Sequence, residues 1–161
     1  VSQMVDHALS LPEGSRLMET GGFKGCSRVV ERDELYGALE DRLGISRRRM
    51  VNEYGMTELL SQLYEPVLRE GPQAAGKHVP PPWLKVRALD PTTLAPLGPG
   101  EPGLLAFFDL ANAGSVSHVL TEDLGSVSTD GVRLLGRFPG AEPRGCSLAL
   151  EEVLSTTGAR P

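Results

Sequence analysis

The chain has 161 residues, of which 40% are hydrophobic and 23% charged. This composition is typical of a globular protein with enough apolar residues for a core and excludes a disordered chain. The formal net charge of -5, from 16 basic and 21 acidic residues, argues against nucleic acid as a partner. There is no run of 18 apolar residues and no basic-then-apolar leader, so we expect no membrane span and a cytoplasmic protein.

Two local features favour ordinary structural roles. Cys26 and Cys146 lie far apart, outside any CxxC or Cys/His cluster, which argues against a metal site or a disulfide framework and favours a reduced compartment. The basic run Arg47-Arg48-Arg49 favours a solvated helix end over a patch that binds nucleic acid.

The first half of the chain predicts an α/β layer. "SRLMETGGFKG" (15–25) reads as a strand that ends in a Gly-Gly turn. "SRVVERDELYGALEDRLG" (27–44) has helical spacing, with Asp33 near its start and Gly44 as a stop. "RRRMVNEYGMTELLSQLYEPV" (47–67) reads as a strand, a Gly turn and a short helix that Thr57 caps and that ends before Pro66. The β-α-β-turn-α order is typical of an α/β layer.

The second half changes character after the loop that contains Pro80-Pro81-Pro82. Four short runs predict strands of an antiparallel sheet or small barrel, separated by turn dipeptides such as Asp130-Gly131. These runs are 83–90, 103–111, 117–127 and 132–138, and a last run, 147–158, reads as a helix. The predicted fold class is therefore mixed α/β, an incomplete α/β layer followed by a β-rich barrel-like lobe. We expect the divisions at 1–75, 76–138 and 139–161.

Glycines and polar residues form three candidate clusters. In the first, Gly21 and Gly22 free the backbone for close approach to a ligand, or simply connect a strand to a helix. This cluster fits neither GxxxxGK[ST] nor GxGxxG. In the second, the residues of 54–58 offer a flat ring for a purine, a hydroxyl for an anion and a carboxylate for Mg²⁺, or a plain helix cap with an acidic first turn. The residues concerned are Tyr54, Gly55, Thr57 and Glu58.

The third cluster lies in "TEDLGSVSTDGVRLLGRFPG" (121–140). Asp123 is able to accept hydrogen bonds from a diol such as a ribose, and Arg137 to donate to the same sugar or to a phosphate. Taken singly, such an Asp is more often an ordinary surface-turn residue, and such an Arg more often an ordinary strand-end residue. The order of the three clusters carries more information than any one of them.

That order resembles the adenylate-forming superfamily of acyl-CoA synthetases, luciferases and peptide-synthetase adenylation domains. Its members share a Tyr-Gly-x-Thr-Glu stretch, a later Thr-Gly-Asp and a Gly-Arg before a small C-terminal domain. "ETGGFKG" (19–25), "NEYGMTEL" (52–59) and "RGCSL" (144–148) are closer to the acyl-protein synthetase (LuxE-type) family. The resemblance covers about Ser15 to Val153 and implies the C-terminal portion of an adenylate-forming fold.

The resemblance implies a role for each matching residue. Gly21 and Gly22 would line the adenine and acyl pocket, and Tyr54, followed by Gly55, would stack on adenine. Thr57 would contact the α-phosphate and Glu58 would hold Mg²⁺. Asp123 would bind the ribose hydroxyls, with Arg137 assisting.

The implied reaction joins a long-chain fatty acid to ATP as an acyl-adenylate. The acyl group then passes to a protein thiol, for which Cys146 is the candidate and Cys26 the rival. The implied partners are the fatty acid and an acyl-accepting protein or acyl reductase.

Two departures from the superfamily pattern bear on activity. The Ser/Thr/Gly-rich phosphate loop is not present and would lie upstream, and Pro139 stands where an acidic hinge residue is usual. We therefore expect a fragment that needs a missing N-terminal half of the adenylation domain. Two alternatives stay open: a catalytically inactive acyl- or nucleotide-binding module or complementing subunit, and a ligase whose acceptor is coenzyme A or a carrier-protein thiol.

Overall fold

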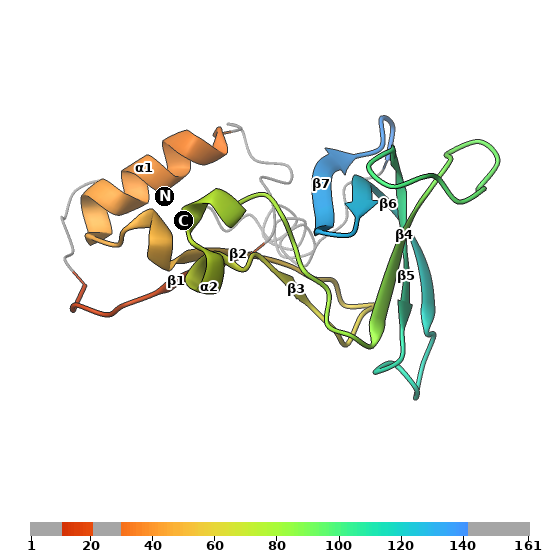
Figure 1. Ribbon diagram of the computed structural model, residues 1–161, viewed down its shortest axis with the longest axis horizontal. Helices are drawn as coiled ribbons and strands as arrows, with labels where there is room; N and C mark the ends of the chain where they lie inside the picture. The colour runs from red at the N-terminus through yellow and green to blue at the C-terminus, as the bar shows by residue number, and fades with distance from the viewer. Residues whose placement is uncertain (1–10, 21–29, 142–161) are drawn as a thin grey trace, which may run out of the picture.

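The computed structural model describes residues 11–20 and 30–141, which form two sheets, the first in the half of the molecule that holds α1 and the second in the other half (Figure 1). The first is three-stranded in the order β1-β2-β3 and the second four-stranded in the order β4-β5-β6-β7. The mixed α/β class is thereby confirmed. In the described residues, no helix is both long enough and apolar enough to cross a membrane.

The first sheet is the predicted β-α-β unit. Strand β1 (Leu17–Thr20) lies parallel to β2 (Met50–Tyr54), and β2 pairs antiparallel with the short β3 (Leu63–Tyr64). Helix α1 (Arg32–Leu43) packs through Leu35, Tyr36 and Leu43 against Met50 of β2. The helix ends as expected, because Gly44 adopts a left-handed conformation (φ 66°) and donates its N–H to the Glu40 carbonyl.

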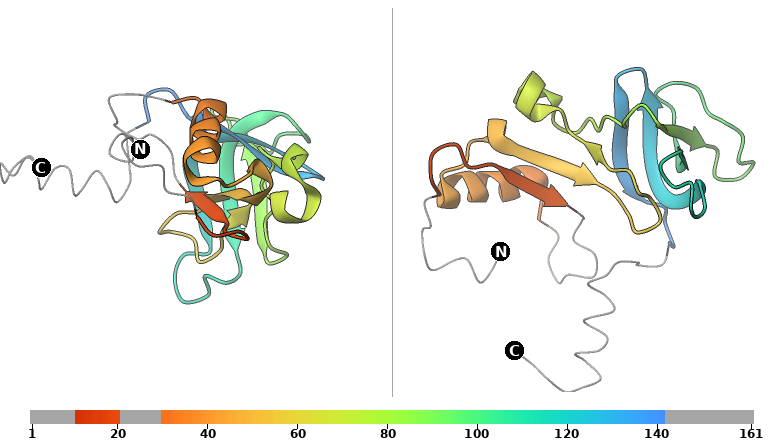
Figure 2. Two further views of the ribbon diagram at one scale, coloured as in Figure 1. Left: turned by 90° about the vertical axis from the view of Figure 1, so that its left-hand side faces the viewer. Right: turned by 90° about the horizontal axis from the view of Figure 1, so that it is seen from below.

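Three short helices complete the first half of the chain. The Arg47–Arg49 run forms a separate 3-10 helix, η2, directly before β2 rather than the end of α1. Helix α2 (Val67–Glu70) and the 3-10 helix η3 (Pro72–Ala74) follow β3. Figure 2 shows α1 and α2 on opposite sides of the first sheet in the view from below.

The second sheet is the predicted antiparallel set. Strands β4 (Leu84–Leu89), β5 (Pro102–Asp109), β6 (His118–Ser128) and β7 (Gly131–Arg137) pair in chain order. Residues 103, 105, 107 and 109 of β5 are buried and alternate with less buried ones, the pattern of a sheet with one face on a core. The chain before β4 pairs with β7 through a His78–Val132 bridge.

One apolar core joins the two halves. Leu59 and Leu63, from the segment after β2, are buried among four residues of the second sheet and its approach: Leu84, Leu105, Phe107 and Val132. A second bridge, between Tyr64 and Val79, connects β3 to the chain that leads into β4. The segment after β2 is therefore fixed by the second sheet as much as by the first.

The predicted helix starting at Thr57 is wrong. Residues 57–58 form a turn and the chain continues irregularly to β3. The physical reason is a competing acceptor: the N–H groups of Leu60 and Ser61 donate to the Asp109 carboxylate at 3.1 and 2.9 Å, instead of to the carbonyls four residues earlier. The predicted helix at 147–158 and the Gly-Gly turn lie outside the described residues.

Candidate nucleotide site

Tyr54 is the last residue of β2 and contacts the second sheet. Its hydroxyl donates a 2.7 Å hydrogen bond to Oδ2 of Asp123 on β6. Its ring stacks on Phe107 of β5, with 5.8 Å between ring centroids and 24° between planes. Burial and the hydrogen bond to Asp123 raise the pKa of Tyr54 well above its usual 10, so the phenol keeps its proton and remains a donor.

Asp123 also binds Arg137, its cross-strand partner on β7. Nη1 of Arg137 donates to Oδ1 of Asp123 at 3.2 Å, and Nη2 donates to Glu122 at 2.8 Å. The Asp123 side chain is 20% exposed. A carboxylate has about four lone-pair sites, so after binding one phenol and one guanidinium it keeps capacity for two hydroxyl donors. These residues therefore fit a ribose diol, with the carboxylate orientation already fixed.

Thr57 and Glu58 lie in the turn that follows β2, and both are exposed. Asn112 holds this turn by donating its amide N–H groups to the carbonyls of Glu58 (2.9 Å) and Val116 (3.0 Å). The turn thus presents a hydroxyl and a carboxylate to solvent on a backbone that is held by the connection between β5 and β6.

Asp109, at the end of β5, fastens the next part of the same loop. It is completely buried and accepts hydrogen bonds from the Leu60 and Ser61 N–H groups and from the Ser61 hydroxyl at 2.8 Å. Trp83 adds a 3.0 Å hydrogen bond to that hydroxyl. A buried carboxylate without such donors is costly, so this set of contacts specifies one loop conformation.

A second buried polar network includes Asn52 of β2. The Glu65 carboxylate is buried and accepts from Arg32 (2.6 Å), from the N–H of Asn52 (3.2 Å) and from the N–H of Gly76. Burial alone would raise the pKa of Glu65, but the hydrogen bonds from Arg32 and these N–H groups outweigh it and lower the pKa. The Asn52 side chain bridges Glu19 (2.6 Å) and His78 (2.6 Å), so the network reaches from β1 to the chain before β4.

The fold connects some of the predicted site residues. Tyr54, Asp123 and Arg137 are joined by hydrogen bonds, while Gly55 and the pair Thr57 and Glu58 follow directly after Tyr54. The remaining candidates, Gly21, Gly22, Cys26 and Cys146, lie outside the described residues.

Sequence reasoning missed the residues that hold this arrangement: Phe107, Asp109, Asn112 and Glu122. One signal was available for Asp109, because an acidic residue inside the apolar run 103–111 needs buried donors. The others depend on which strands become neighbours.

Two facts bear on a metal ion. Over residues 11–20 and 30–141, no group of three or more His, Cys, Asp or Glu side chains is placed to hold one. Mg²⁺ beside phosphates usually takes only one or two protein carboxylates and completes its shell with phosphate and water, so an exposed Glu58 fits such a role without a cluster.

The arrangement of the two sheets is that of adenylate-forming enzymes. The chain is similar to a long-chain-fatty-acid-CoA ligase from Archaeoglobus fulgidus (TM-score 0.56, 16% identity, 98% of this chain and 34% of that one). It is also similar to the O-succinylbenzoate coenzyme A synthetase from Bacillus subtilis, solved with AMP (TM-score 0.53, 20% identity, 84% of this chain and 29% of that one). The partial adenylate-forming fold is thereby confirmed.

Sequence comparison identifies the family to which the chain belongs within this fold. The profile of the acyl-protein synthetase family, LuxE, matches residues 2–155, and the chain belongs to this family. It is 35% identical over 166 aligned positions to the long-chain-fatty-acid–luciferin-component ligase of Aliivibrio fischeri, and 30% identical over 82 positions to that of Vibrio harveyi. These matches cover 94% and 47% of this chain but only 42% and 22% of the two relatives, so the chain spans less than half of their length.

Proposed function

We propose that this chain is part of an ATP-dependent ligase that activates a long-chain fatty acid as its acyl-adenylate and passes the acyl group to a cysteine thiol. One observation carries the proposal: folding joins Tyr54 of the first sheet to Asp123 and Arg137 of the second, in a chain of the acyl-protein synthetase family. The named relatives are long-chain-fatty-acid ligases, which supports the substrate class.

Asp123 is the residue we assign to the ribose of ATP. Tyr54 binds one of its carboxylate oxygens and Arg137 the other, so the carboxylate would meet the sugar with little reorganisation. The Tyr54 ring, which packs on Phe107 through one face, would support the adenine through its other side or edge, with Gly21 and Gly22 completing that pocket.

The first step is displacement at the α-phosphorus of ATP. A fatty-acid carboxylate oxygen forms the new bond to phosphorus, the bond to the bridging oxygen breaks, and pyrophosphate leaves. Thr57 would donate its hydroxyl to an α-phosphate oxygen as charge builds there. Glu58 would hold Mg²⁺, which when bound neutralises phosphate charge.

The second step forms a thioester. The Cys146 thiolate would attack the acyl carbonyl and AMP would leave. This assignment rests on the resemblance of "RGCSL" (144–148) and on the intrinsic nucleophilicity of thiolates. Cys26 remains the rival acceptor, and coenzyme A or a carrier-protein thiol the alternative one.

A second function is favoured by the 42% share of the Aliivibrio fischeri ligase that the chain spans. The chain would then be a complementing subunit, or an inactive acyl- or nucleotide-binding module, that works together with the part of the adenylation domain that it does not match.

We also propose the division at 1–75, 76–138 and 139–161, since the first sheet ends before residue 75 and the second begins at Leu84.

ATP–pyrophosphate exchange with fatty acids tests the proposal, on this chain alone and together with the unmatched part of the Aliivibrio fischeri ligase. We expect exchange from the combination and about 100-fold less from its Asp123→Ala variant, with Asp130→Ala, in the exposed β6–β7 turn, as the matched control. Labelled fatty acid should form a thioester that Cys146→Ser abolishes. Undiminished labelling in Cys146→Ser would contradict self-acylation, and absence of exchange from both samples would contradict adenylation.

A further inference from the structure

His78 is a buried titratable residue to which the proposed reaction assigns no part. It is 3% exposed and lies in the chain before β4. Its ring contacts Asn52 of β2, with 2.6 Å between Nε2 and Oδ1, and its backbone exchanges two hydrogen bonds of 2.8 Å with Val132 of β7. His78 therefore connects the first sheet to the second.

The neighbours of Asn52 fix the position of the proton on His78. The amide NH₂ of Asn52 donates to Glu19 of β1, at 2.6 Å to the carboxylate and 3.3 Å to the carbonyl, so the amide oxygen faces His78. Because an amide oxygen only accepts, Nε2 of His78 carries the proton. Nδ1 is buried and, over residues 11–20 and 30–141, has no hydrogen-bond partner. Burial lowers the pKa of His78, which favours the neutral ring.

A ring nitrogen left without a partner in a core needs an explanation, because an apolar side chain would fill the same space without that cost. What the imidazole supplies and an apolar side chain does not is direction. A hydrogen bond favours one distance and one orientation of its two groups. The contact with His78 thus places Asn52, and with it β2, relative to the second sheet.

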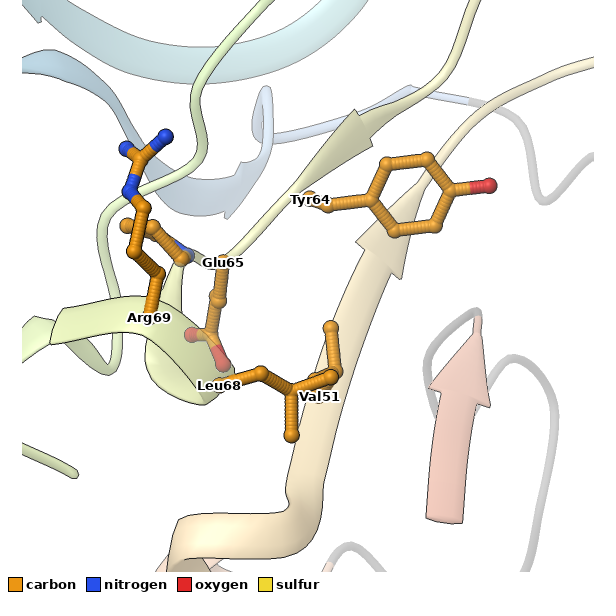
Figure 3. A pocket seen from close by; sticks show the side chains of 6 residues that line it. Val51, Tyr64, Glu65, Leu68 and Arg69 are labelled. Atoms are coloured by element: carbon orange, nitrogen blue, oxygen red, sulfur yellow. The ribbon is translucent and has the colours of Figure 1, made fainter. Parts of the chain in front are cut away.

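The backbone of Asn52 is held as well as its side chain. Its N–H donates to the Glu65 carboxylate at 3.2 Å, and its carbonyl accepts from the Glu65 N–H at 3.1 Å. Figure 3 shows Glu65 directly after β3, in the pocket that it lines together with Val51 of β2 and Leu68 of α2. Because Asn52 is held at both ends, a shift of His78 is passed on to β2 rather than absorbed by the Asn52 side chain.

Asn52 and Tyr54 lie two positions apart on β2 and therefore share one face of the strand. Both are connected to the paired strands β6 and β7. Tyr54 is connected through its 2.7 Å hydrogen bond to Asp123 on β6. Asn52 is connected through His78, which is bridged to Val132 on β7. One such contact leaves a strand free to turn about it, whereas two contacts fix its orientation.

We propose that His78 is a positioning residue of the nucleotide site: through Asn52 it aligns Tyr54 with Asp123 and so orients the carboxylate that we assign to the ribose. His78 acts through Asn52 rather than on the nucleotide. This role rests on the proposed function, because it takes Asp123 as the residue that binds the ribose.

A double-mutant cycle of Tyr54→Phe and Asp123→Ala measures the alignment without any ligand. In the wild-type background, urea unfolding should show a coupling between the two residues of about tenfold in the unfolding equilibrium constant. In the His78→Leu background we expect this coupling to disappear. His78→Gln should restore it, because the Gln amide NH₂ replaces the Nε2 donor. His118→Leu, at an exposed residue of β6, is the matched control and should leave the coupling unchanged.

Asn52→Ala breaks the same contact from its other end. The coupling between Tyr54 and Asp123 should disappear in this background too, so the test does not depend on the folding of His78→Leu.

The preference of the chain for ATP over 2′-deoxy-ATP is the second measurement. A carboxylate oriented toward the ribose diol should favour ATP by about tenfold in affinity, because the deoxy sugar leaves an acceptor without its donor. We expect His78→Leu to lose this preference, His78→Gln to regain it and His118→Leu to keep it. A residue that only stabilises the fold would change the free energy of unfolding without changing this ratio.

The two measurements separate this role from the proposed function. A full tenfold coupling in folded His78→Leu or Asn52→Ala would overturn the positioning role, and so would a preference for ATP that His78→Leu retains. Coupling that depends on His78, without any preference for ATP over 2′-deoxy-ATP, would support the positioning of Tyr54 and contradict the assignment of Asp123 to the ribose.

Discussion

Both sheets pack on an apolar core, and they differ in how the buried carboxylate beside each is held: Glu65, directly after β3, has a charged partner, whereas Asp109 of β5 has neutral donors. Beneath β2, the Glu65 carboxylate is paired with Arg32 and with backbone N–H groups. In the second sheet the core consists of residues such as Leu105 and Phe107, and its buried Asp109 accepts only from neutral donors. Apolar burial is non-directional, but hydrogen bonds and ion pairs fix positions.

The difference explains where the candidate site lies. The apolar core holds the two sheets together, and polar contacts at its edge set the positions of Tyr54, Asp123 and the turn at 57–58. Neither sheet alone contains the arrangement, because Tyr54 belongs to the first and Asp123 to the second.

The largest effect is expected from the core that both regions share. Phe107 is only 2% exposed. Phe107→Ala should therefore leave a cavity in the core and reduce the free energy of unfolding by about 3–5 kcal/mol. Phe108→Ala, whose ring stacks on exposed His118 at 4.3 Å, is the control and should cost clearly less. Urea unfolding measures both. Equal losses would contradict the placement of the core on the Phe107 face.

Asp109→Ala tests the buried carboxylate of the second sheet, which accepts hydrogen bonds from uncharged donors. The substitution leaves the Leu60 and Ser61 N–H groups without their acceptor, at a cost of about 2–4 kcal/mol. It should also free the loop from 57 to 61, seen as faster hydrogen exchange of Leu60 and Ser61. The exposed Asp130→Ala is the control. Unchanged protection of Ser61 would show that Asp109 does not hold the loop.

Glu65→Gln tests the charged network of the first sheet. We expect a loss of about 2–3 kcal/mol, less than for a fully buried pair, because the Arg32 side chain is 38% exposed and regains water. Glu70→Gln, which removes a surface carboxylate, is the control and should change stability little. If urea unfolding ranks Glu70→Gln as the more damaging, the network is not a main support of this sheet.

The smallest expected effect is a loss of stability at acidic pH. Burial lowers the pKa of His78 from its usual 6.5, with Glu65, Arg32 and Glu53 as its charged neighbours. Below about pH 6.5 the unfolded chain takes up a proton on this residue that the folded chain does not, so the free energy of unfolding decreases as pH falls. The lowered pKa of Glu65 acts in the same direction below its usual 4.5.

Urea unfolding at about pH 7.5 and about pH 5.5 measures this loss. His78→Gln should lessen it by removing one titrating group, whereas His118→Gln, on an exposed residue of β6, should leave it unchanged. An identical pH dependence in all three proteins would remove His78 as its source.

The sequence determined the local elements of this protein. Helical spacing and Gly44 predicted α1, and short strand-like runs between turn dipeptides predicted β4 to β7, because each signal is carried by residues close together in the chain. The order of three motifs along the chain indicated the family. What followed Tyr54 was predicted wrongly, since the acceptor that replaces the helical carbonyls is Asp109, 48 positions from Ser61.

Only the tertiary structure decided how the site is held. The pairing of Tyr54 with Asp123 spans 69 positions, and Asn112 reaches Glu58 across 54. Such contacts form only when the Leu59 and Leu63 side chains enter the core of the second sheet. That burial, which depends on the packing of both sheets at once, turns separate motifs into one surface.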